Sequence, residues 1–226
     1  MQPTRLTRMH LNPAHPGVRR DLHDYVGLHK TLMRLAGMPA TCPHPRREAG
    51  LLFRLETDHP TPVLYVQTTH PPLLDALPAG YGQARTLHLT PHLQTLTAGT
   101  RVHYRITASP SARIGHNPPP RHPAPGHPRA TPLHRGQLTG LYGPDALAWW
   151  QRRALQAGLH LDDVSMQPQP FRCRRDTPTN RHHTLTRFEG TATITDAPAL
   201  TDAVTAGIGR GQAYGAGLLS VAPATP

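Results

Sequence analysis

Proline and glycine interrupt this chain so often that they limit the length of every helix and strand it forms. The 226 residues include 27 prolines and 19 glycines. Both residue types favour turns, and both weaken the interior of regular elements. A chain of this length forms one large domain or two small ones, because domains cluster near about 100–150 residues. We therefore expect short elements joined by many turns, with part of the chain in loops.

The chain is also strongly basic. It carries 24 lysine and arginine residues against 13 acidic ones, a net charge of +11 that its 17 histidines increase at low pH. This balance indicates a polyanion as partner. Lys30 is the single lysine, so nearly all basic residues are arginines. A GC-rich genome explains this preference for arginine as well as function does. Guanidinium groups also suit phosphate oxygens. Aromatic residues make up 5% of the chain, which favours backbone and shape contacts to nucleic acid over base stacking.

Several classes of protein are disfavoured. No run approaches the roughly 18 apolar residues of a membrane span, and residues 1–10 lack a signal peptide's apolar core, so we expect a soluble cytoplasmic protein. Cys42 and Cys173 lie far apart without a CxxC spacing, which disfavours a disulfide scaffold and a cysteine zinc site. No HExxH spacing occurs, and no carboxylates are placed to complete a site at His182 and His183. We expect no metal and no cofactor.

The first half of the chain predicts the order strand, helix, strand, strand, helix, strand. Apolar residues alternate in the strand segments, and in the longer helix they recur every three or four residues. This order is that of the split βαβ, ferredoxin-like unit. The predicted segments are strand 5–12, helix 18–35, hairpin strands 51–56 and 62–68, short helix 71–77 and strand 83–90.

The second half repeats this order. Residues 109–132 are crowded with proline, histidine and arginine and cannot bury enough apolar surface to order themselves, so we expect a mobile loop there. Gly143 and Pro144 precede the first helix, which places Asp145 at its N-cap or in its first turn. The predicted segments are strand 100–108, helix 145–157, strands 164–174 and 184–195, helix 197–206 and strand 218–222.

The predicted fold is therefore α+β, with two tandem ferredoxin-like (RRM-like) βαββαβ domains. We place the N-terminal domain at residues 1–93 and the C-terminal domain at residues 94–226. The two halves share a pattern of elements but no matching residues.

A glycine-rich loop at residues 207–217 is the most specific local segment. Bare backbone N–H groups in such a loop can approach phosphates, with Arg210 adding a charge in the middle. The loop follows a helix and precedes a strand, the reverse of a Rossmann fingerprint, and it lacks a P-loop ending. A tight turn that needs positive φ accounts for one or two glycines, so we expect the loop to bind phosphate. Its glycines are Gly207, Gly209, Gly211, Gly215 and Gly217.

His29 is the candidate for proton transfer. It lies on the predicted helix 18–35, beside Lys30 and one turn from Tyr25. Residues three and four apart share a helix face, and histidine changes its charge near neutral pH. The alternative is an ordinary helix histidine without a chemical role.

A basic turn at residues 171–183 is the candidate for binding an anionic ligand in the second half. Alternate side chains of a strand share a face, so Arg172 and Arg174 point toward one ligand surface. A solvated surface hairpin explains the same pattern equally well. The cations of this turn are Arg172, Arg174, Arg175 and Arg181, and Arg105 and Arg113 extend the positive surface from the neighbouring strand.

Eight segments in the same order along residues 5–223 carry a family resemblance. They are RLTRMHLNP, LHKTLMRL, LLFRLE, VLYVQTTHPP, VHYRITASPSAR, AWWQRRALQAGLHL, FEGTATITDAPAL and GIGRGQAYGAGLLSVAP. In these segments the chain resembles the CasE family, the CRISPR RNA-processing endoribonucleases of type I-E systems and subunits of Cascade. The resemblance covers nearly the whole chain.

The resemblance implies two ferredoxin-like domains that bind the CRISPR-repeat hairpin and cut it once, at the 3′ base of the stem, without a metal ion. The ribose 2′-OH attacks the adjacent phosphate, which leaves a cyclic phosphate and a 5′-OH fragment. A histidine moves the protons while arginines hold the phosphate. The product then stays bound as mature guide RNA with the other Cascade subunits.

The family's histidine falls on His29, and two neighbouring positions depart from the family pattern. Members commonly carry tyrosine three residues before the histidine, where this chain has Val26, with Tyr25 one position earlier. Gln212 stands where many members carry lysine, so Arg210 is expected to supply that charge. The resemblance thus assigns catalysis to His29 with the aid of Tyr25. RNA binding falls to Arg105, Arg172, Arg174, Arg175, Arg181, Gly207, Gly209, Arg210, Gly211 and Gln212.

Two other functions stay open. One is a non-catalytic RNA-binding scaffold that caps a guide RNA, which the shifted tyrosine favours. The other is a basic ribosome-associated or assembly protein. The presence of His29 on a helix favours the endoribonuclease.

Overall fold

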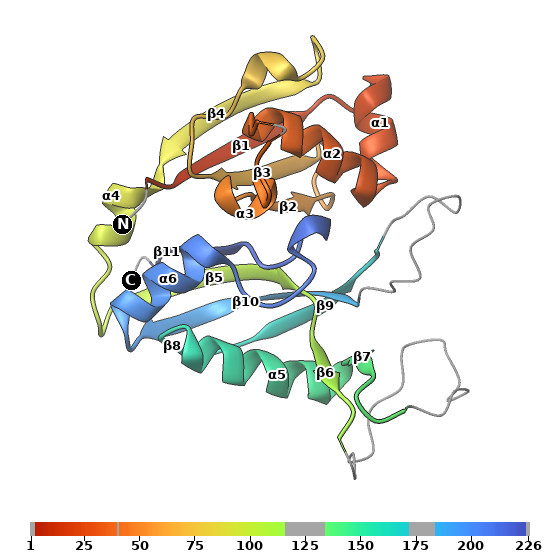
Figure 1. Cartoon of the computed structure of the whole chain (residues 1–226). Coiled ribbons are helices and arrows are strands. Elements are labelled where there is room, and N and C mark those ends of the chain that lie inside the picture. Colours follow the sequence, from red (N-terminus) through yellow and green to blue (C-terminus); the bar gives the residue numbers. More distant parts are fainter. Residues whose placement is uncertain (1–2, 40, 116–133, 172–183, 225–226) are drawn as a thin grey trace.

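The computed structural model describes residues 3–39, 41–115, 134–171 and 184–224. In these residues the chain forms two large antiparallel sheets, one from each half of the sequence. Figure 1 shows the N-terminal sheet, in red to yellow, beside the C-terminal sheet, in green to blue. No helix in the described ranges is long and apolar enough to cross a membrane.

The N-terminal sheet has the strand order β2-β3-β1-β4, which confirms the predicted ferredoxin-like arrangement of this half. The alternation of polar and apolar residues explains its first strand, since Met9 and Leu11 are buried while Arg8 and His10 are exposed. The elements are β1 (Arg5–Leu11), α1 (Pro16–Leu22), α2 (Tyr25–Ala36), α3 (Pro45–Glu48), β2 (Leu52–Glu56), β3 (Val63–Thr68), the 3₁₀ turn η1 (Leu74–Ala76) and β4 (Gly82–His88).

The prediction of one helix over residues 18–35 is wrong, because the chain forms α1 and α2 with a break at His23 and Asp24. Asp24 is extended, and its carboxylate accepts the backbone N–H of Val26 at 3.1 Å, so it caps α2. Gly37, with φ of 64°, ends α2. Apolar residues keep helical spacing through both helices, so their period alone does not reveal the break.

The predicted second helix of this half, residues 71–77, is also wrong. The structure has a single 3₁₀ turn, η1, at this position. Pro71 and Pro72 precede η1 and Pro78 follows it. Proline lacks a backbone N–H and restricts the residue before it, so the space between these prolines holds one turn.

The C-terminal sheet has the order β11-β5-β10-β8, with β9 also paired to β10, and this again confirms the ferredoxin-like arrangement. Figure 1 shows α5 on the side of this sheet that faces away from the N-terminal half. The elements are α4 (Leu89–Gln94), β5 (Arg101–Ala108), β6 (Ser111–Arg113), β7 (Leu138–Gly140), α5 (Gly143–Gln156), β8 (Leu159–Leu161), β9 (Ser165–Gln169), β10 (Leu185–Ile194), α6 (Ala197–Ala206), the 3₁₀ turn η2 (Gln212–Tyr214) and β11 (Leu219–Pro223).

The predicted strand over residues 164–174 differs from the structure. Two strands, β8 and β9, pair with opposite ends of β10. Between them the Asp163 carboxylate accepts the backbone N–H of Thr191 at 3.2 Å, a donor that a continuous ladder would use. Residues 172–174 of the predicted strand lie outside the described residues.

Two boundaries in the second half need correction. Residues 111–113, which we assigned to a loop, form β6 and pair with β7, while 116–132 of that loop lie outside the described residues. Helix α5 begins at Gly143, so Pro144 belongs to its first turn. Proline is well suited to that position because the first helical N–H groups have no partner in the helix. Asp145 lies in the first turn, as expected.

Two hydrophobic cores support the sheets, and they meet between the halves. In the C-terminal core Trp150 is fully buried and stacks on Phe188 with ring centroids 5.6 Å apart. Leu185 and Ala216, from the second half, pack into the N-terminal core. α4 lies between β4 and β5, and its Leu93 packs into the C-terminal core. The boundary between residues 93 and 94 remains a prediction.

Candidate active site

Helix α2 is held at both of its faces, and this fixes the position of His29. The apolar residues Leu28 and Leu32 are buried against the N-terminal sheet. On another side of the helix, the Thr31 hydroxyl donates to the buried Asp21 carboxylate at 2.8 Å, and Tyr81 donates to the same oxygen at 2.8 Å. Buried carboxylates with several hydrogen bonds resist movement. His29 therefore extends from a rigid helix.

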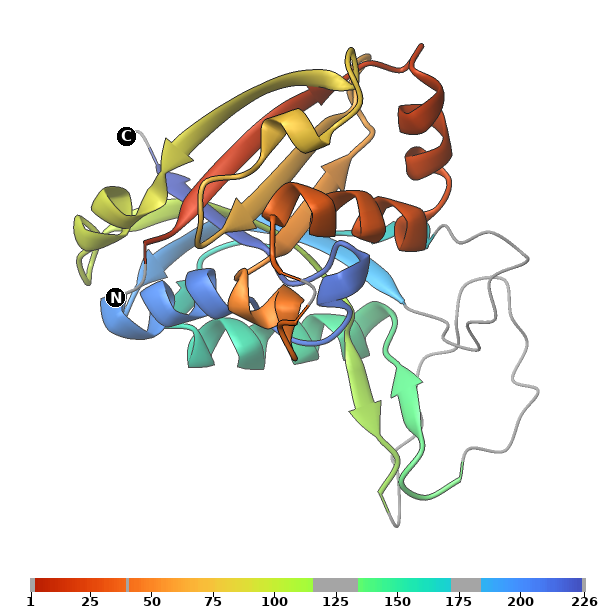
Figure 2. The same cartoon turned by 45° about the horizontal axis from the view of Figure 1, so that its top comes forward.

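His29 opens into a cavity of about 320 Å³ between α2 and α3. The cavity is basic, since two arginines and a second histidine share its wall with His29. Figure 2 shows α2 in red-orange, α3 in orange and the blue turn η2 close together at this place. The lining residues are His29, Met33, Pro43, His44, Pro45, Arg46 and Arg47.

The environment of His29 favours its neutral form. Burial lowers the pKa of His29 below its usual 6.5, and the nearby positive charge of Arg46 lowers it further. Its Nδ1 atom is buried and has no hydrogen-bond partner among the described residues. A protonated ring carries an N–H at both nitrogens, so protonation would leave a buried donor unsatisfied. At neutral pH the His29 ring is therefore unprotonated, which is the form that can act as a base.

Arg46 links this cavity to the glycine-rich loop. Its Nη1 donates to the side-chain oxygen of Gln212 at 2.9 Å and to the carbonyl of Leu51 at 3.3 Å. Gln212 is fixed in turn, because its amide nitrogen donates to the carbonyl of Ala206 at 3.1 Å. The neighbouring helices α2 and α3 thus meet η2, from the far end of the sequence, at one site.

All five glycines of the loop at residues 207–217 have positive φ, between 75° and 92°. The expectation that a turn explains only one or two of them is wrong. Close packing adds a second requirement, since a Cβ at Gly209 would lie 3.1 Å from the Trp149 ring and one at Gly215 would lie 3.1 Å from Phe53. Gly207, Gly209, Gly211 and Gln212 remain predicted phosphate contacts, but backbone geometry alone accounts for the glycines.

Tyr25, the predicted aid to His29, is buried in the N-terminal core. Its ring stacks on Phe171 with centroids 5.9 Å apart, and Phe171 meets Tyr214 of η2 edge to face at 5.6 Å. These aromatic contacts join α2 to η2. They also give Tyr25 a packing role that the sequence did not predict.

The predicted RNA-binding arginines are in different surroundings. Arg210 is exposed and is not part of the wall of the His29 cavity. Arg113 is exposed on β6 and donates to the carbonyl of Gly136 at 3.0 Å. Phe171 is the last described residue before the basic turn. The cations of that turn, Arg172, Arg174, Arg175 and Arg181, lie outside the described residues.

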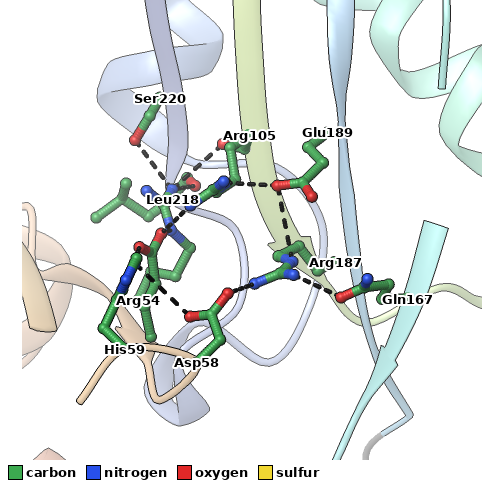
Figure 3. Close-up of polar contacts among 10 residues, drawn as sticks. Arg54, Asp58, His59, Arg105, Gln167, Arg187, Glu189, Leu218 and Ser220 are labelled. Carbon is green, nitrogen blue, oxygen red and sulfur yellow. Dashed lines mark hydrogen bonds and ion pairs between the residues drawn. The ribbon is translucent and has the colours of Figure 1, made fainter. Parts of the chain in front are cut away.

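Arg105 lies away from His29, in a group of charged residues between the two sheets that we name the interface cluster (Figure 3). Arg105 pairs with Glu56 at 3.2 Å and with Glu189 at 2.6 Å. The buried Arg54 pairs with Glu56 at 2.9 Å and donates to the Ser220 hydroxyl at 2.9 Å, which ties β2 to the C-terminal sheet. The interface cluster comprises Arg54, Glu56, Asp58, Arg105, Arg187 and Glu189.

One group in this region has the composition of a metal site. The ligand atoms of Glu56, Asp58 and His59 lie within 4.8 Å of one another, a proximity that the sequence did not indicate. Both carboxylates already pair with arginines, Glu56 with Arg54 and Asp58 with Arg187 at 2.6 Å. Arginine neutralises the charge that would attract a cation. Glu56 and Asp58 instead form ion pairs that join the two halves, with Arg105 and Arg187.

Arg46 and its contact with Gln212 were missed by sequence reasoning. Arg46 lies in what we interpreted as a connection between elements, and the sequence separates it from Gln212 by 166 positions. The hydrogen bond between them follows from the packing of the two halves. The sequence signal available is an arginine pair, and such pairs also occur at residues 19–20, 152–153 and 174–175.

The fold and the site together define a protein of two ferredoxin-like domains, with a histidine in a basic cavity where the glycine-rich loop of the second domain meets the first. The family model described as "CRISPR associated protein" matches residues 5–223, and the chain belongs to this family.

Similar proteins agree with this membership. The chain is 29% identical to the CRISPR-associated endoribonuclease Cse3 of Thermus thermophilus over 96% of its own length and 99% of the relative's. It is 34% identical to the CRISPR system Cascade subunit CasE of Escherichia coli over 57% of this chain and 61% of CasE. The solved structure of Thermus thermophilus Cse3 bound to an RNA representing a pre-cleavage complex is similar with a TM-score of 0.76. In that comparison the identity is 29%, and 98% of this chain and 100% of that chain are covered.

Proposed function

We propose that this protein is an endoribonuclease that binds the CRISPR-repeat hairpin and cleaves precursor CRISPR RNA at the 3′ base of the stem. The single observation that carries this proposal is the position of His29, half-buried in a basic cavity where its pKa is lowered. A neutral imidazole beside cations suits proton abstraction next to a phosphate. The names of the full-length relative and of the RNA-bound structure support the substrate class.

The proposed reaction needs no metal ion. His29 takes the proton of the ribose 2′-OH, and the 2′ oxygen forms a bond to the adjacent phosphorus. The bond from phosphorus to the 5′ oxygen breaks, and that oxygen takes up a proton from water, while the protonated His29 releases its proton to solvent. The products are a cyclic phosphate and a fragment with a 5′-OH. Cationic side chains stabilise the charge that develops on the phosphate oxygens.

The proposed partners are the repeat hairpin, as precursor and as mature guide RNA, and the other subunits of Cascade. The named Cascade subunit among the relatives supports this assignment. The cleaved product keeps the whole stem, so most contacts to its phosphates survive the reaction. We expect one product per protein molecule when hairpin is in excess, and repeated fast turnover would contradict retention.

A non-catalytic scaffold that caps a guide RNA is the second candidate. The packing of Tyr25 against Phe171 favours it, because the tyrosine nearest to His29 in the sequence serves the core. The two candidates differ in whether the protein cuts RNA at all.

The deciding experiment is His29→Ala with the repeat hairpin and EDTA present. Loss of a general acid or base slows a reaction by about 10²–10⁴-fold, so we expect slower cleavage with hairpin binding kept. The exposed His160 on β8 provides the control, and His160→Ala should cut at the wild-type rate. Equal rates for both variants would favour the scaffold, and loss of wild-type activity in EDTA would overturn the metal-independent reaction.

A further inference from the structure

Among the described residues, Arg46 of α3 is the cation that acts most directly on His29. The two side chains line the same cavity. The charge of Arg46 also depresses the pKa of His29. An imidazole senses a charge in this way only when the two groups are close and poorly separated by solvent.

Arg46 differs from the arginines of the interface cluster in its partners. Its Nη1 bonds to two neutral acceptors, the Gln212 side chain and the Leu51 carbonyl. In the described part of the chain, no carboxylate pairs with Arg46. Burial and the neighbouring Arg47 lower the pKa of Arg46 below its usual value, and its neutral partners leave its charge incompletely compensated. A bound anion would provide the missing compensation.

The hydrogen bonds of Arg46 leave one edge of the guanidinium available. Because the protein acceptors take Nη1, the Nε and Nη2 atoms have no partner among the described residues. These two atoms carry parallel N–H groups, which match two oxygens of one phosphate. The Gln212 bond fixes the plane of the group and lowers the entropy lost when a phosphate binds.

We propose that Arg46 binds the scissile phosphate through its free edge, and that Gln212 positions it for this contact. The inference rests on the proposed function and names the residue that acts on the phosphate while His29 acts on the 2′-OH. It replaces Arg210, which is exposed and outside the cavity, as the cation at the cut. Arg46 is then a catalytic residue and Gln212 a positioning residue.

The test is single-turnover cleavage of the repeat hairpin by Arg46→Ala, Arg46→Lys and Gln212→Ala. Removal of one preorganised donor to a developing oxyanion costs about 10²–10³-fold in rate, so we expect a loss of this size for Arg46→Ala. Arg46→Lys keeps the charge without the fork and should retain a part of the rate. Gln212→Ala should lose less than Arg46→Ala, because it loosens the contact without removing it.

The dependence of the rate on pH separates a role at the phosphate from a structural one. With Arg46→Ala, the pKa of His29 should rise, so the rise of the rate with pH should move to higher pH. Arg46→Lys should leave it near its wild-type position. The other ionisable groups on the elements around His29 are Tyr25, Lys30 and Arg34 of α2, Arg47 and Glu48 of α3 with its N-cap His44, and Tyr214 of η2. His44→Ala and Arg47→Ala serve as controls for their charges.

Two further variants make the outcomes decisive. Arg152→Ala removes an exposed charge on α5 and controls for net charge. Arg210→Ala tests the competing cation. A wild-type rate for Arg46→Ala, or a large loss for Arg210→Ala alone, would overturn the role of Arg46 while the slow His29→Ala still supports the endoribonuclease. If Arg46→Ala fails to fold, a wild-type rate for both Arg46→Lys and Gln212→Ala would overturn it.

Discussion

Two arginine-rich regions of this molecule follow opposite electrostatic rules. In the interface cluster, Arg54, Arg105 and Arg187 each pair with a carboxylate at 3.2 Å or less. Beside His29, Arg46 bonds to an amide and a carbonyl, and its charge lowers the pKa of the histidine. Matched charges join the two sheets, whereas an unmatched charge is available to a ligand. The kind of partner, more than the residue type, separates the structural arginines from the proposed RNA-binding one.

The largest effect in the interface cluster should come from Arg54→Ala. Arg54 and Glu56 are both buried, with side chains 4% and 3% exposed. Removing one partner of a buried ion pair costs about 3–5 kcal/mol because the other charge is left uncompensated. Urea unfolding should show this loss, and the double variant Arg54→Ala/Glu56→Gln should recover part of it. A loss below about 1 kcal/mol would mean that Arg54 does not hold the sheets together.

A smaller effect is expected for Arg105→Ala, which also tests the sequence prediction that Arg105 binds RNA. Its side chain is 37% exposed, and solvent screens such pairs to about 0.2–1 kcal/mol. We expect a stability loss within that range and little change in hairpin affinity at constant salt. A marked fall in affinity without loss of stability would instead place Arg105 at the RNA.

The smallest effect concerns the stability of the histidine region at low pH. The folded protein holds the pKa of His29 below its unfolded value, so the unfolded chain binds the proton more readily. Stability is therefore fully present above pH 6.5 and falls as pH decreases through that value. Thermal unfolding at pH 7 and pH 5 should show a smaller decrease for His29→Gln than for the wild type. Equal decreases would show that His29 is not buried in its neutral form.

The sequence by itself determined the order of elements and the identity of the candidate histidine. Alternation in β1 and the spacing of apolar residues in α2 are local patterns, and each reflects which side chains must leave water. These patterns yielded both ferredoxin-like halves. They failed where local polar bonds override the apolar period, as at the Asp24 cap of α2 and at Asp163 between β8 and β9.

Only the tertiary structure decided which cation stands beside His29. The choice between Arg46 and Arg210 depends on how α3 packs against the glycine-rich loop, and the bond between Arg46 and Gln212 joins residues 166 positions apart. The same is true of Arg105. The sequence predicts a free surface charge, but in the structure the carboxylate of Glu56, from the other half, lies 3.2 Å from Arg105. Electrostatic energy depends on distance and burial in three dimensions, and spacing along a chain specifies neither.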